Sequence, residues 1–321
     1  MAAVKRAAKA GAEKAGAEKA GAEKAGAEKV GDVVRDAMRP DMTPSEQAAW
    51  VEDAASCVRR NGGIVLRDAI PKPVLDAVLE DFKVRHDVHM APGQKKLYRR
   101  FQSDPLRAQV PIAIDGPAAN PAFFAPPSVT ALARKLMGED LIIGEMGVVI
   151  SHAGAGPQEI HRDSHFLFGG IDTEMDLPPF AMTLLVPLLD VTEGMGPTEF
   201  WPGTHLNRDE TAEGPPQRAV VSAGSVTFID SRVLHRGGAN VTGPVRPTAY
   251  FSFHRPWYVE KFGYEEKPQV RVTPAMLQRL PEAYRPLFSW ALHLNRTDSV
   301  QEFVYRWTGR IRRRLLKLKG A

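Results

Sequence analysis

Residues 158–163, Gln-Glu-Ile-His-Arg-Asp, and residues 233–240, Val-Leu-His-Arg-Gly-Gly-Ala-Asn, carry the pattern from which the architecture of this 321-residue chain is inferred. His161 and Asp163 are two residues apart, so on an extended backbone their side chains point to the same side. His235 follows an apolar run and begins a glycine-containing turn. Two histidines and one carboxylate form the facial triad of non-haem Fe(II) oxygenases, which leaves coordination positions open. The pattern therefore predicts an Fe(II) site.

An arginine follows the second histidine at a spacing that suits a carboxylate site. Arg246 lies eleven residues after His235 and just before residues 248–253, Thr-Ala-Tyr-Phe-Ser-Phe, which read as a strand. A guanidinium binds a carboxylate through two parallel hydrogen bonds. Arg246 could therefore hold one end of a dicarboxylate co-substrate whose other end chelates the iron.

The surrounding sequence predicts helices followed by a β-rich body. Residues 43–46, Thr-Pro-Ser-Glu, form a capping box with proline at the first helical position, so a helix is expected from there to about residue 60. Further helices are expected at 71–86 and 128–137. Short apolar runs rich in β-branched or aromatic residues predict strands at 64–66, 141–150, 181–189, 219–222, 225–229 and 248–253. The fold class is mainly β with flanking helices, and the strand spacing is typical of a barrel or sandwich.

Composition and charge exclude several classes of protein. Hydrophobic residues make up 43% and charged residues 25%, which is the globular average. The net charge of +4 comes from the ends, because residues outside 1–30 and 305–321 include 28 Lys and Arg against 34 Asp and Glu. A nucleic-acid-binding domain would carry its positive charge on the folded body, so no nucleic-acid partner is expected. The single cysteine, Cys57, and the absence of an apolar leader or spanning segment favour a cytoplasmic protein.

Both ends of the chain differ from its middle. Residues 1–42 contain near-identical Gly-Ala-Glu-Lys repeats and are expected to form a low-complexity tail, with the folded domain over 43–300. Residues 301–321 place five apolar side chains at helical spacing among many arginines and lysines, which predicts a basic amphipathic helix. This helix would pack on the core or on a second subunit, or else lie on a membrane surface.

Residues from about 60 to 256 resemble the phytanoyl-CoA dioxygenase family of Fe(II)- and 2-oxoglutarate-dependent oxygenases. The resemblance rests on four segments in order: 61–67, 158–163, the segment 196–205 that ends in Pro-Gly-Thr-His, and 235–240 followed by Arg246. It implies a double-stranded β-helix, a cupin-like jelly-roll. It also implies that His161, Asp163 and His235 are the iron ligands, and that 2-oxoglutarate is bound by Arg246, with Gln158 and Thr183 beside it.

The resemblance further implies a reaction. Iron, 2-oxoglutarate and O2 would oxidise an unactivated C–H bond, by hydroxylation, desaturation or ring formation, with release of succinate and CO2. Asp163 is intact, unlike the carboxylate position in halogenating relatives. Gly237 stands where some members carry a hydroxyl residue that touches 2-oxoglutarate, so that contact is expected to come from elsewhere.

The substrate and the competing functions are less constrained by the sequence. Phe166, Phe168, Trp201 and Tyr98 are candidates for an apolar pocket. The context of Gln158 and the absence of a basic cluster in the middle of the chain favour a neutral, apolar small molecule, such as a secondary-metabolite intermediate, over a CoA thioester. The alternatives are an acyl-CoA hydroxylase, a catalytically silent jelly-roll binding protein, and a jelly-roll hydrolase or isomerase that uses another metal. An oligomer is compatible with the sequence.

Overall fold

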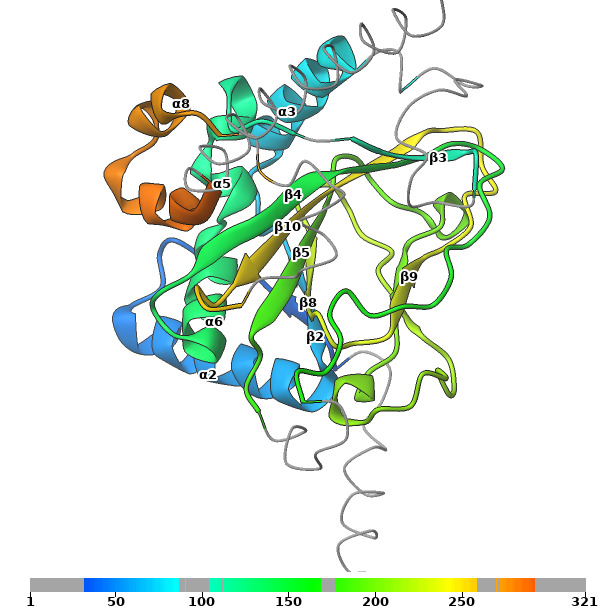
Figure 1. Ribbon diagram of the computed structural model, residues 1–321, viewed down its shortest axis with the longest axis horizontal. Coiled ribbons are helices and arrows are strands. Elements are labelled where there is room, and N and C mark those ends of the chain that lie inside the picture. Colours follow the sequence, from blue (N-terminus) through cyan, green and yellow to red (C-terminus); the bar gives the residue numbers. More distant parts are fainter. Residues whose placement is uncertain are drawn as a thin grey trace, which may run out of the picture.

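Two β-sheets face each other in the computed structural model, which describes residues 32–86, 90, 104–110, 112–168, 177–258, 270 and 272–291 (Figure 1). The larger sheet has seven strands in the order β1 (Val34–Asp36), β2 (Gly63–Arg67), β8 (Val226–Asp230), β5 (Ala181–Pro187), β10 (Arg246–His254), β4 (Ile142–Ser151) and β3 (Arg107–Val110). The smaller sheet has the order β7 (Gln217–Arg218), β6 (Thr198–Phe200) and β9 (His235–Gly237). All strand pairs are antiparallel except β1 with β2.

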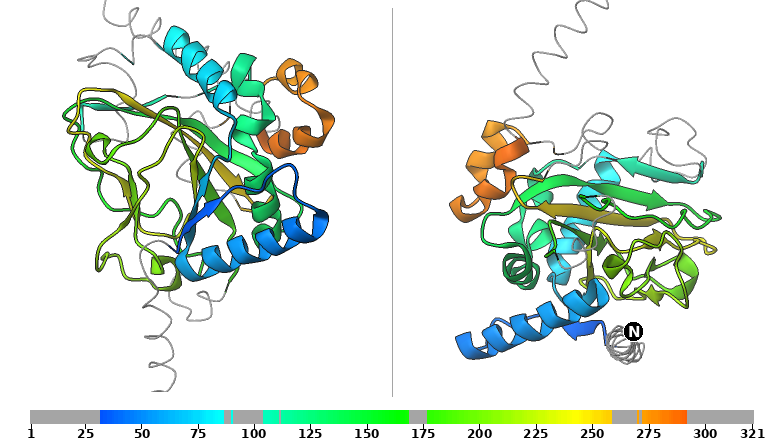
Figure 2. Two further views of the ribbon diagram at one scale, coloured as in Figure 1. Left: turned by 180° about the vertical axis from the view of Figure 1, so that it is seen from behind. Right: turned by 60° about the horizontal axis from the view of Figure 1, so that its bottom comes forward.

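Helices cover the face of the large sheet that points away from β9 (Figures 1 and 2). They are α2 (Pro44–Asn61), α3 (Lys72–Arg85), α5 (Pro121–Phe124), α6 (Pro127–Met137) and α8 (Pro274–Arg279), with short 3-10 turns η2 (Gly116–Ala119), η4 (Glu193–Met195), η5 (Thr204–Leu206) and η6 (Glu282–Phe288). The helix expected from the capping box is confirmed. The Thr43 hydroxyl accepts from the backbone N–H of Glu46, whose carboxylate accepts from the Thr43 N–H. Gly62 ends α2 in the left-handed conformation, with φ of 75°.

The central strand β10 separates the hydrophobic core from a polar interior. Its residues Ala249, Phe251 and Phe253 are fully buried on the helix-covered face, where Phe251 meets Phe123 edge to face at 5.1 Å between ring centroids. The alternate residues point toward the smaller sheet, because successive side chains of a strand point to opposite faces. They are all polar: Arg246, Thr248, Tyr250, Ser252 and His254.

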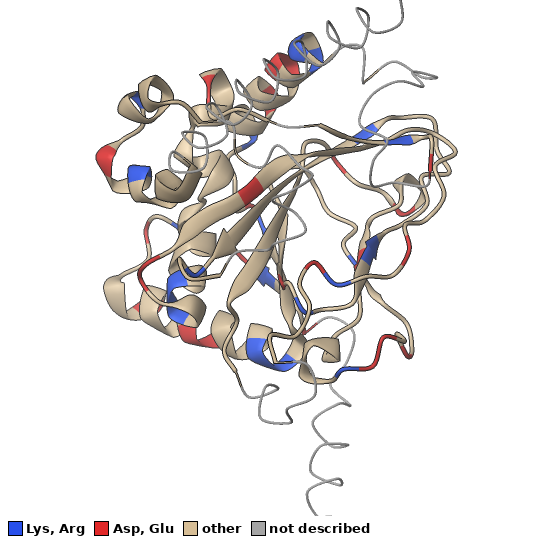
Figure 3. Ribbon diagram, viewed as in Figure 1, with Lys and Arg blue, Asp and Glu red and all other residues tan. Residues whose placement is uncertain are grey.

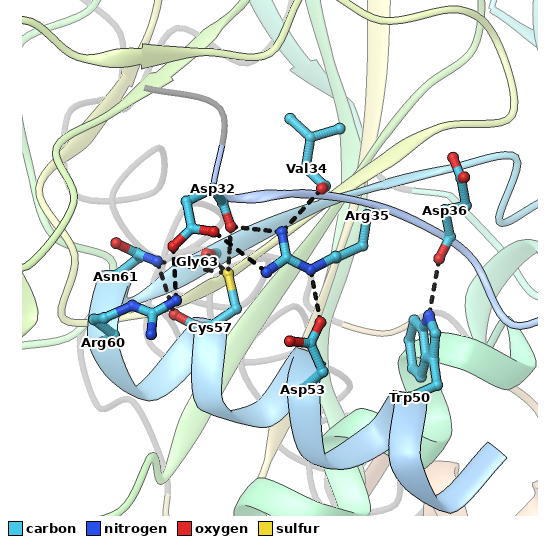
Figure 4. A network of polar contacts seen from close by, with 10 residues as sticks. All are labelled: Asp32, Val34, Arg35, Asp36, Trp50, Asp53, Cys57, Arg60, Asn61 and Gly63. Atoms are coloured by element: carbon cyan, nitrogen blue, oxygen red, sulfur yellow. Dashed lines mark hydrogen bonds and ion pairs between the residues drawn. The ribbon is translucent and has the colours of Figure 1, made fainter. Parts of the chain in front are cut away.

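The fold begins before Thr43, which differs from the boundary expected at residue 43. Strand β1 pairs in parallel with β2, and Val33 is buried in the core. A network of polar contacts fixes this strand to α2 (Figure 4). The Arg35 guanidinium donates to Asp53 at 2.7 Å, and the Trp50 indole donates to the backbone carbonyl of Asp36 at 2.9 Å. Residues 32–42 therefore belong to the folded domain, since their backbone and side chains are held by it.

The main helices and strands predicted from the sequence are confirmed, with one exception. The strand expected at 219–222 is wrong, because only Val221 pairs, in an isolated bridge with Val191. Strands β3, β6, β7 and β9 were not predicted, since runs of two to four residues show no clear alternation. The repeats and the amphipathic helix at 301–321 lie outside the described residues. Within the described part, no helix has the length and apolar character needed to cross a membrane.

Charged residues are spread over the described helices and loops with both signs interspersed (Figure 3). The arginines that matter for the site are buried between the two sheets, as described below.

Candidate metal centre

The two histidines lie directly opposite each other on paired backbone segments. The N–H of His161 donates to the carbonyl of His235 at 3.0 Å, and the reverse hydrogen bond measures 2.9 Å. Their ring centroids are 4.4 Å apart. The Asp163 carboxylate completes the group: its Oδ1 lies 3.6 Å from Nε2 of His235 and 3.9 Å from Nε2 of His161. One ligand atom from each residue falls within 4.8 Å of the others, so the set can meet a single cation.

Backbone carbonyls orient both imidazoles for metal binding. Nδ1 of His161 lies 2.8 Å from the carbonyl of Glu159, and Nδ1 of His235 lies 3.1 Å from that of Val233. Because a carbonyl only accepts, each Nδ1 is assigned as the protonated nitrogen, and each Nε2 keeps its lone pair for a cation. Burial lowers the pKa of His235, so this ring is neutral, which is the form that binds a metal.

Thr183 holds the carboxylate of Asp163. Its Oγ1 donates to Oδ2 of Asp163 at 2.7 Å, which leaves Oδ1 facing the histidines. Thr183, which the resemblance places beside the co-substrate, lines the cavity, and its hydroxyl is hydrogen-bonded to the Asp163 carboxylate. Thr183 also lies 3.4 Å from the hydroxyl of Ser252 on the neighbouring strand β10. Asp163 is thus fixed by the large sheet, although it belongs to the loop after the β4 strand.

Two buried arginines lie at one end of the interior. No described residue accepts a hydrogen bond from the Arg246 guanidinium, and its Nε is fully buried. Burial, together with the neighbouring charge of Arg107, lowers the pKa of Arg246 to about 9, so it remains protonated at neutral pH. Arg107 donates to the carbonyls of Gly156 and Gly238, while its Nη1 is buried without a described partner. The Asp104 carboxylate lies 3.9 Å from Nε of Arg107, whereas no anion of the described residues pairs with Arg246. A buried cation without an anion is costly, so Arg246 fits a carboxylate ligand.

Gln158 and Gly237 lie next to the two arginines and belong to the segments that carry His161 and His235. The Gly237 N–H donates to Oε1 of Gln158 at 2.8 Å. A Cβ on Gly237 would lie 2.6 Å from Oε1 of Gln158, 3.0 Å from Nη1 of Arg107 and 3.4 Å from Nη2 of Arg246. The absence of a side chain at Gly237 therefore lets these three polar groups approach the backbone closely. Gln158, Arg107, Gly237 and Arg246 all line the same cavity.

The described residues of the site surround a cavity of about 470 Å³. Most of the described residues that line it are polar in type, and Phe166, Phe168 and Trp201, expected in an apolar pocket, are not among them. Trp201 is buried beneath Arg236 and donates to the carbonyl of Gly214, while Phe168 is 54% exposed. Tyr98 lies outside the described residues. Apart from the residues already named, the lining includes Gln109, Glu145, Val149, Ser164, Ala181, Leu185, Ser231 and Arg236.

Arg162, between the two ligands of the first motif, is a structural residue that sequence reasoning missed. Because successive side chains alternate, it points away from the metal and into the protein. Its guanidinium donates to four backbone carbonyls, those of Thr204, Asn207, Asp209 and Arg232. The last of these precedes His235 by three residues. Arg162 therefore fixes the first motif to the loop that carries the third ligand.

Comparisons with known proteins agree with this site. The sequence pattern of the phytanoyl-CoA dioxygenase (PhyH) family matches residues 58–248, which include all the proposed ligands. The iron/alpha-ketoglutarate-dependent dioxygenase penM of Penicillium thymicola is 34% identical over 102 residues, 30% of this chain and 33% of that protein. The dioxygenase af480 of Aspergillus fumigatus is 25% identical over 239 residues, 68% of this chain and 70% of that protein.

The fold is also that of a solved enzyme. The crystal structure of SnoN, a non-haem alpha-ketoglutarate-dependent epimerase from nogalamycin biosynthesis, superposes with a TM-score of 0.51 at 21% identity, over 71% of this chain and 93% of that one. The jelly-roll fold and the enzyme class predicted from the sequence, a dioxygenase that uses iron and 2-oxoglutarate, are confirmed. The chain belongs to the phytanoyl-CoA dioxygenase family.

Proposed function

We propose that His161, Asp163 and His235 hold Fe(II), that Arg246 binds the distal carboxylate of 2-oxoglutarate, and that the enzyme oxidises a C–H bond of a small molecule. The observation that carries this proposal is the Arg246 guanidinium. It is buried, positively charged and without a described hydrogen-bond acceptor in the same cavity as the three ligands. A protein that did not bind an anion there would leave this charge uncompensated.

Each residue then has a defined task. His161, Asp163 and His235 present one ligand atom each. The imidazoles donate to the carbonyls of Glu159 and Val233, and the Thr183 hydroxyl donates to Asp163, which fixes their orientation. Arg246 and Arg107 offset the charge of the distal carboxylate, and Gln158 lies beside it. When bound, iron and 2-oxoglutarate supply the O2 activation that oxidises the substrate. The protein keeps the reacting groups in a fixed geometry between two sheets.

Three other functions fit the site less well. A silent binding protein would not need three correctly oriented ligands together with the buried arginine. A hydrolase or isomerase with another metal would not need Arg246. An acyl-CoA hydroxylase would require basic residues for the CoA phosphates, whereas Arg107 and Arg246 are buried at the co-substrate end and Arg162 donates only to backbone carbonyls.

The substrate proposed here is a small molecule of secondary metabolism. Named relatives include fungal dioxygenases, and SnoN belongs to nogalamycin biosynthesis. The polar lining of the cavity favours a molecule that carries hydrogen-bonding groups on an otherwise apolar skeleton. Hydroxylation, desaturation and ring formation are all compatible with this arrangement.

The proposal is tested by anaerobic visible absorption on adding Fe(II) and then 2-oxoglutarate to the metal-free protein. Wild type is expected to show a weak metal-to-ligand charge-transfer band. The band should be lost in His235→Ala and should require more 2-oxoglutarate in Arg246→Ala. Arg67→Ala, which removes an exposed arginine on β2, is the matched control and should titrate like wild type. No band in wild type at saturating iron and 2-oxoglutarate would refute the assignment.

A further inference from the structure

His254 is a buried histidine that the metal centre does not use. It is the last residue of β10 and lies at the end of the strand opposite Arg246. In the sheet His254 pairs with Ala181 of β5, and Ser252 pairs with Thr183, whose hydroxyl donates to Asp163. Because same-face neighbours along a strand are about 7 Å apart, His254 lies about 7 Å along β10 from Ser252. Its imidazole lines the cavity.

The fold makes specific room for this imidazole. A β-bulge in β4 leaves Gly144 as an extra residue, because Ser252 pairs with Glu145 whereas Phe253 pairs with Ile143. A Cβ on Gly144 would lie 2.2 Å from Nδ1 of His254. Bulges are enriched next to active sites, where they redirect side chains.

Packing, and not hydrogen bonding, holds the ring in place. Tyr258 meets His254 edge to face at 5.2 Å between ring centroids, and the Tyr258 hydroxyl lies 2.9 Å from that of Ser164. Neither nitrogen of His254 is hydrogen-bonded to a described residue, and Nδ1 is fully buried. Burial lowers the pKa of His254 to about 4, so the ring is neutral and has one donor and one acceptor nitrogen. Nδ1 packs against Gly144, so Nε2 is the nitrogen that remains for a partner from the cavity that His254 lines. Buried polar groups usually have such a partner.

We propose that His254 contacts the substrate and determines specificity by hydrogen-bonding a hydroxyl group of the substrate. A hydroxyl both donates and accepts, as a neutral imidazole does. Ser252 and Glu145 line the same end of the cavity and supply further polar groups. This proposal rests on the function proposed above, because His254 would hold the substrate hydroxyl close to Thr183, which is hydrogen-bonded to the proposed iron ligand Asp163. It selects for substrates that are already hydroxylated, so a hydroxylating or ketone-reducing step would precede this enzyme.

The test uses the full chain loaded with Zn(II), a diamagnetic stand-in for iron, and 2-oxoglutarate, with histidine ring nitrogens labelled with 15N for NMR. The probes are two matched pairs of alcohol and hydrocarbon, cyclohexanol with cyclohexane and norborneol with norbornane. Methyl signals of Leu185 and Val149, which line the cavity, report that each probe has bound. His205, a buried histidine whose Nε2 lies 3.0 Å from the Arg59 carbonyl, is the internal control.

We expect the alcohols to shift the ring nitrogens of His254 but not those of His205, and to bind about tenfold more tightly than the hydrocarbons, as one net hydrogen bond predicts. His254→Phe and Gly144→Ala should abolish this preference. If His254→Phe does not fold, the test rests on the shift of the His254 ring nitrogens in wild type and on the alcohol preference of Gly144→Ala. Equal affinity within each pair, a preference that persists in the variants, or no shift of His254 at the highest soluble probe concentration would overturn the proposal. The wild-type charge-transfer band tests the metal site separately, so the two proposals can fail independently.

Discussion

The hydroxyl of Thr183 lies 2.7 Å from Oδ2 of Asp163, so a residue of the large sheet fixes a carboxylate that comes from a loop and that we propose as a metal ligand. The hydrogen bond occupies one carboxylate oxygen and directs the other toward the two histidines. The hydrogen bond therefore positions Asp163 relative to the large sheet. The two histidines lie on the other side of the cavity, because His235 belongs to the smaller sheet and pairs with His161.

Thr183→Val should weaken metal binding without unfolding the protein. The change keeps the branched shape but removes the hydrogen bond from Thr183 to Asp163, and loss of such outer contacts lowers metal affinity by about 10- to 100-fold. Competition with a metal chelator measures the affinity. Thr183→Ser restores the hydroxyl and should bind metal like wild type. Equal affinity of Thr183→Val and wild type would show that Asp163 is held in another way.

Arg246→Met and Arg107→Met should each weaken 2-oxoglutarate binding. A charged hydrogen bond contributes about 1.5–3 kcal/mol, so we expect a dissociation constant raised by roughly 10- to 100-fold, with the larger effect at Arg246. The charge-transfer band measures the titration. 2-Oxobutyrate lacks the distal carboxylate and should bind wild type and both variants alike. A variant that loses affinity for both ligands equally would place the defect at the metal.

Gly237→Ala should reduce 2-oxoglutarate affinity because the added Cβ enters the space between Gln158 and the two arginines. Overpacking of this kind costs about 1–3 kcal/mol, equivalent to roughly 5- to 150-fold in affinity. Combining Gly237→Ala with Gln158→Ala removes the nearest clash at 2.6 Å, so the two effects should not add. Additive losses in this double-mutant cycle would contradict the proposed convergence.

Arg162→Met should destabilise the protein and misalign the metal ligands. Four backbone carbonyls would lose their donor, and two of them, those of Thr204 and Arg232, accept buried hydrogen bonds. An unsatisfied buried group costs about 1–3 kcal/mol. Chemical denaturation of the metal-free protein measures the stability, and chelator competition measures the metal affinity. Arg162→Lys keeps the charge but has fewer donors, so its stability and metal affinity should lie between those of wild type and Arg162→Met. Arg134→Met, on the exposed side of α6, is a matched control expected to change neither quantity.

Features that depend on neighbouring residues could be predicted from the sequence. The capping box at Thr43, the His161 and Asp163 pair on one side of the chain, and the arginine at Arg246 are all local patterns. The role of Thr183 and the presence of Arg107 in the site could not be predicted. They follow from the register of β5 with β10 and of β3 with β4, which brings residues distant in sequence together.

The substrate pocket was mispredicted for a related reason. Aromatic residues near strands were expected to line it, yet Trp201 faces Arg236 and Gly214 instead. Which face of a strand is interior depends on sheet pairing, and a shift of one residue exchanges the two faces. No local property of Trp201 determines that choice.

The division of β10 into two faces has a consequence for how this protein can diverge. Ala249, Phe251 and Phe253 pack in the hydrophobic core, while Thr248, Ser252 and His254 line the cavity. Substitutions at the second set change the cavity and leave the hydrophobic core unchanged. Mutations can therefore change substrate choice at one set of positions and stability at the other, although both sets belong to the same strand. We expect natural and laboratory evolution of new specificities to concentrate on those alternate positions.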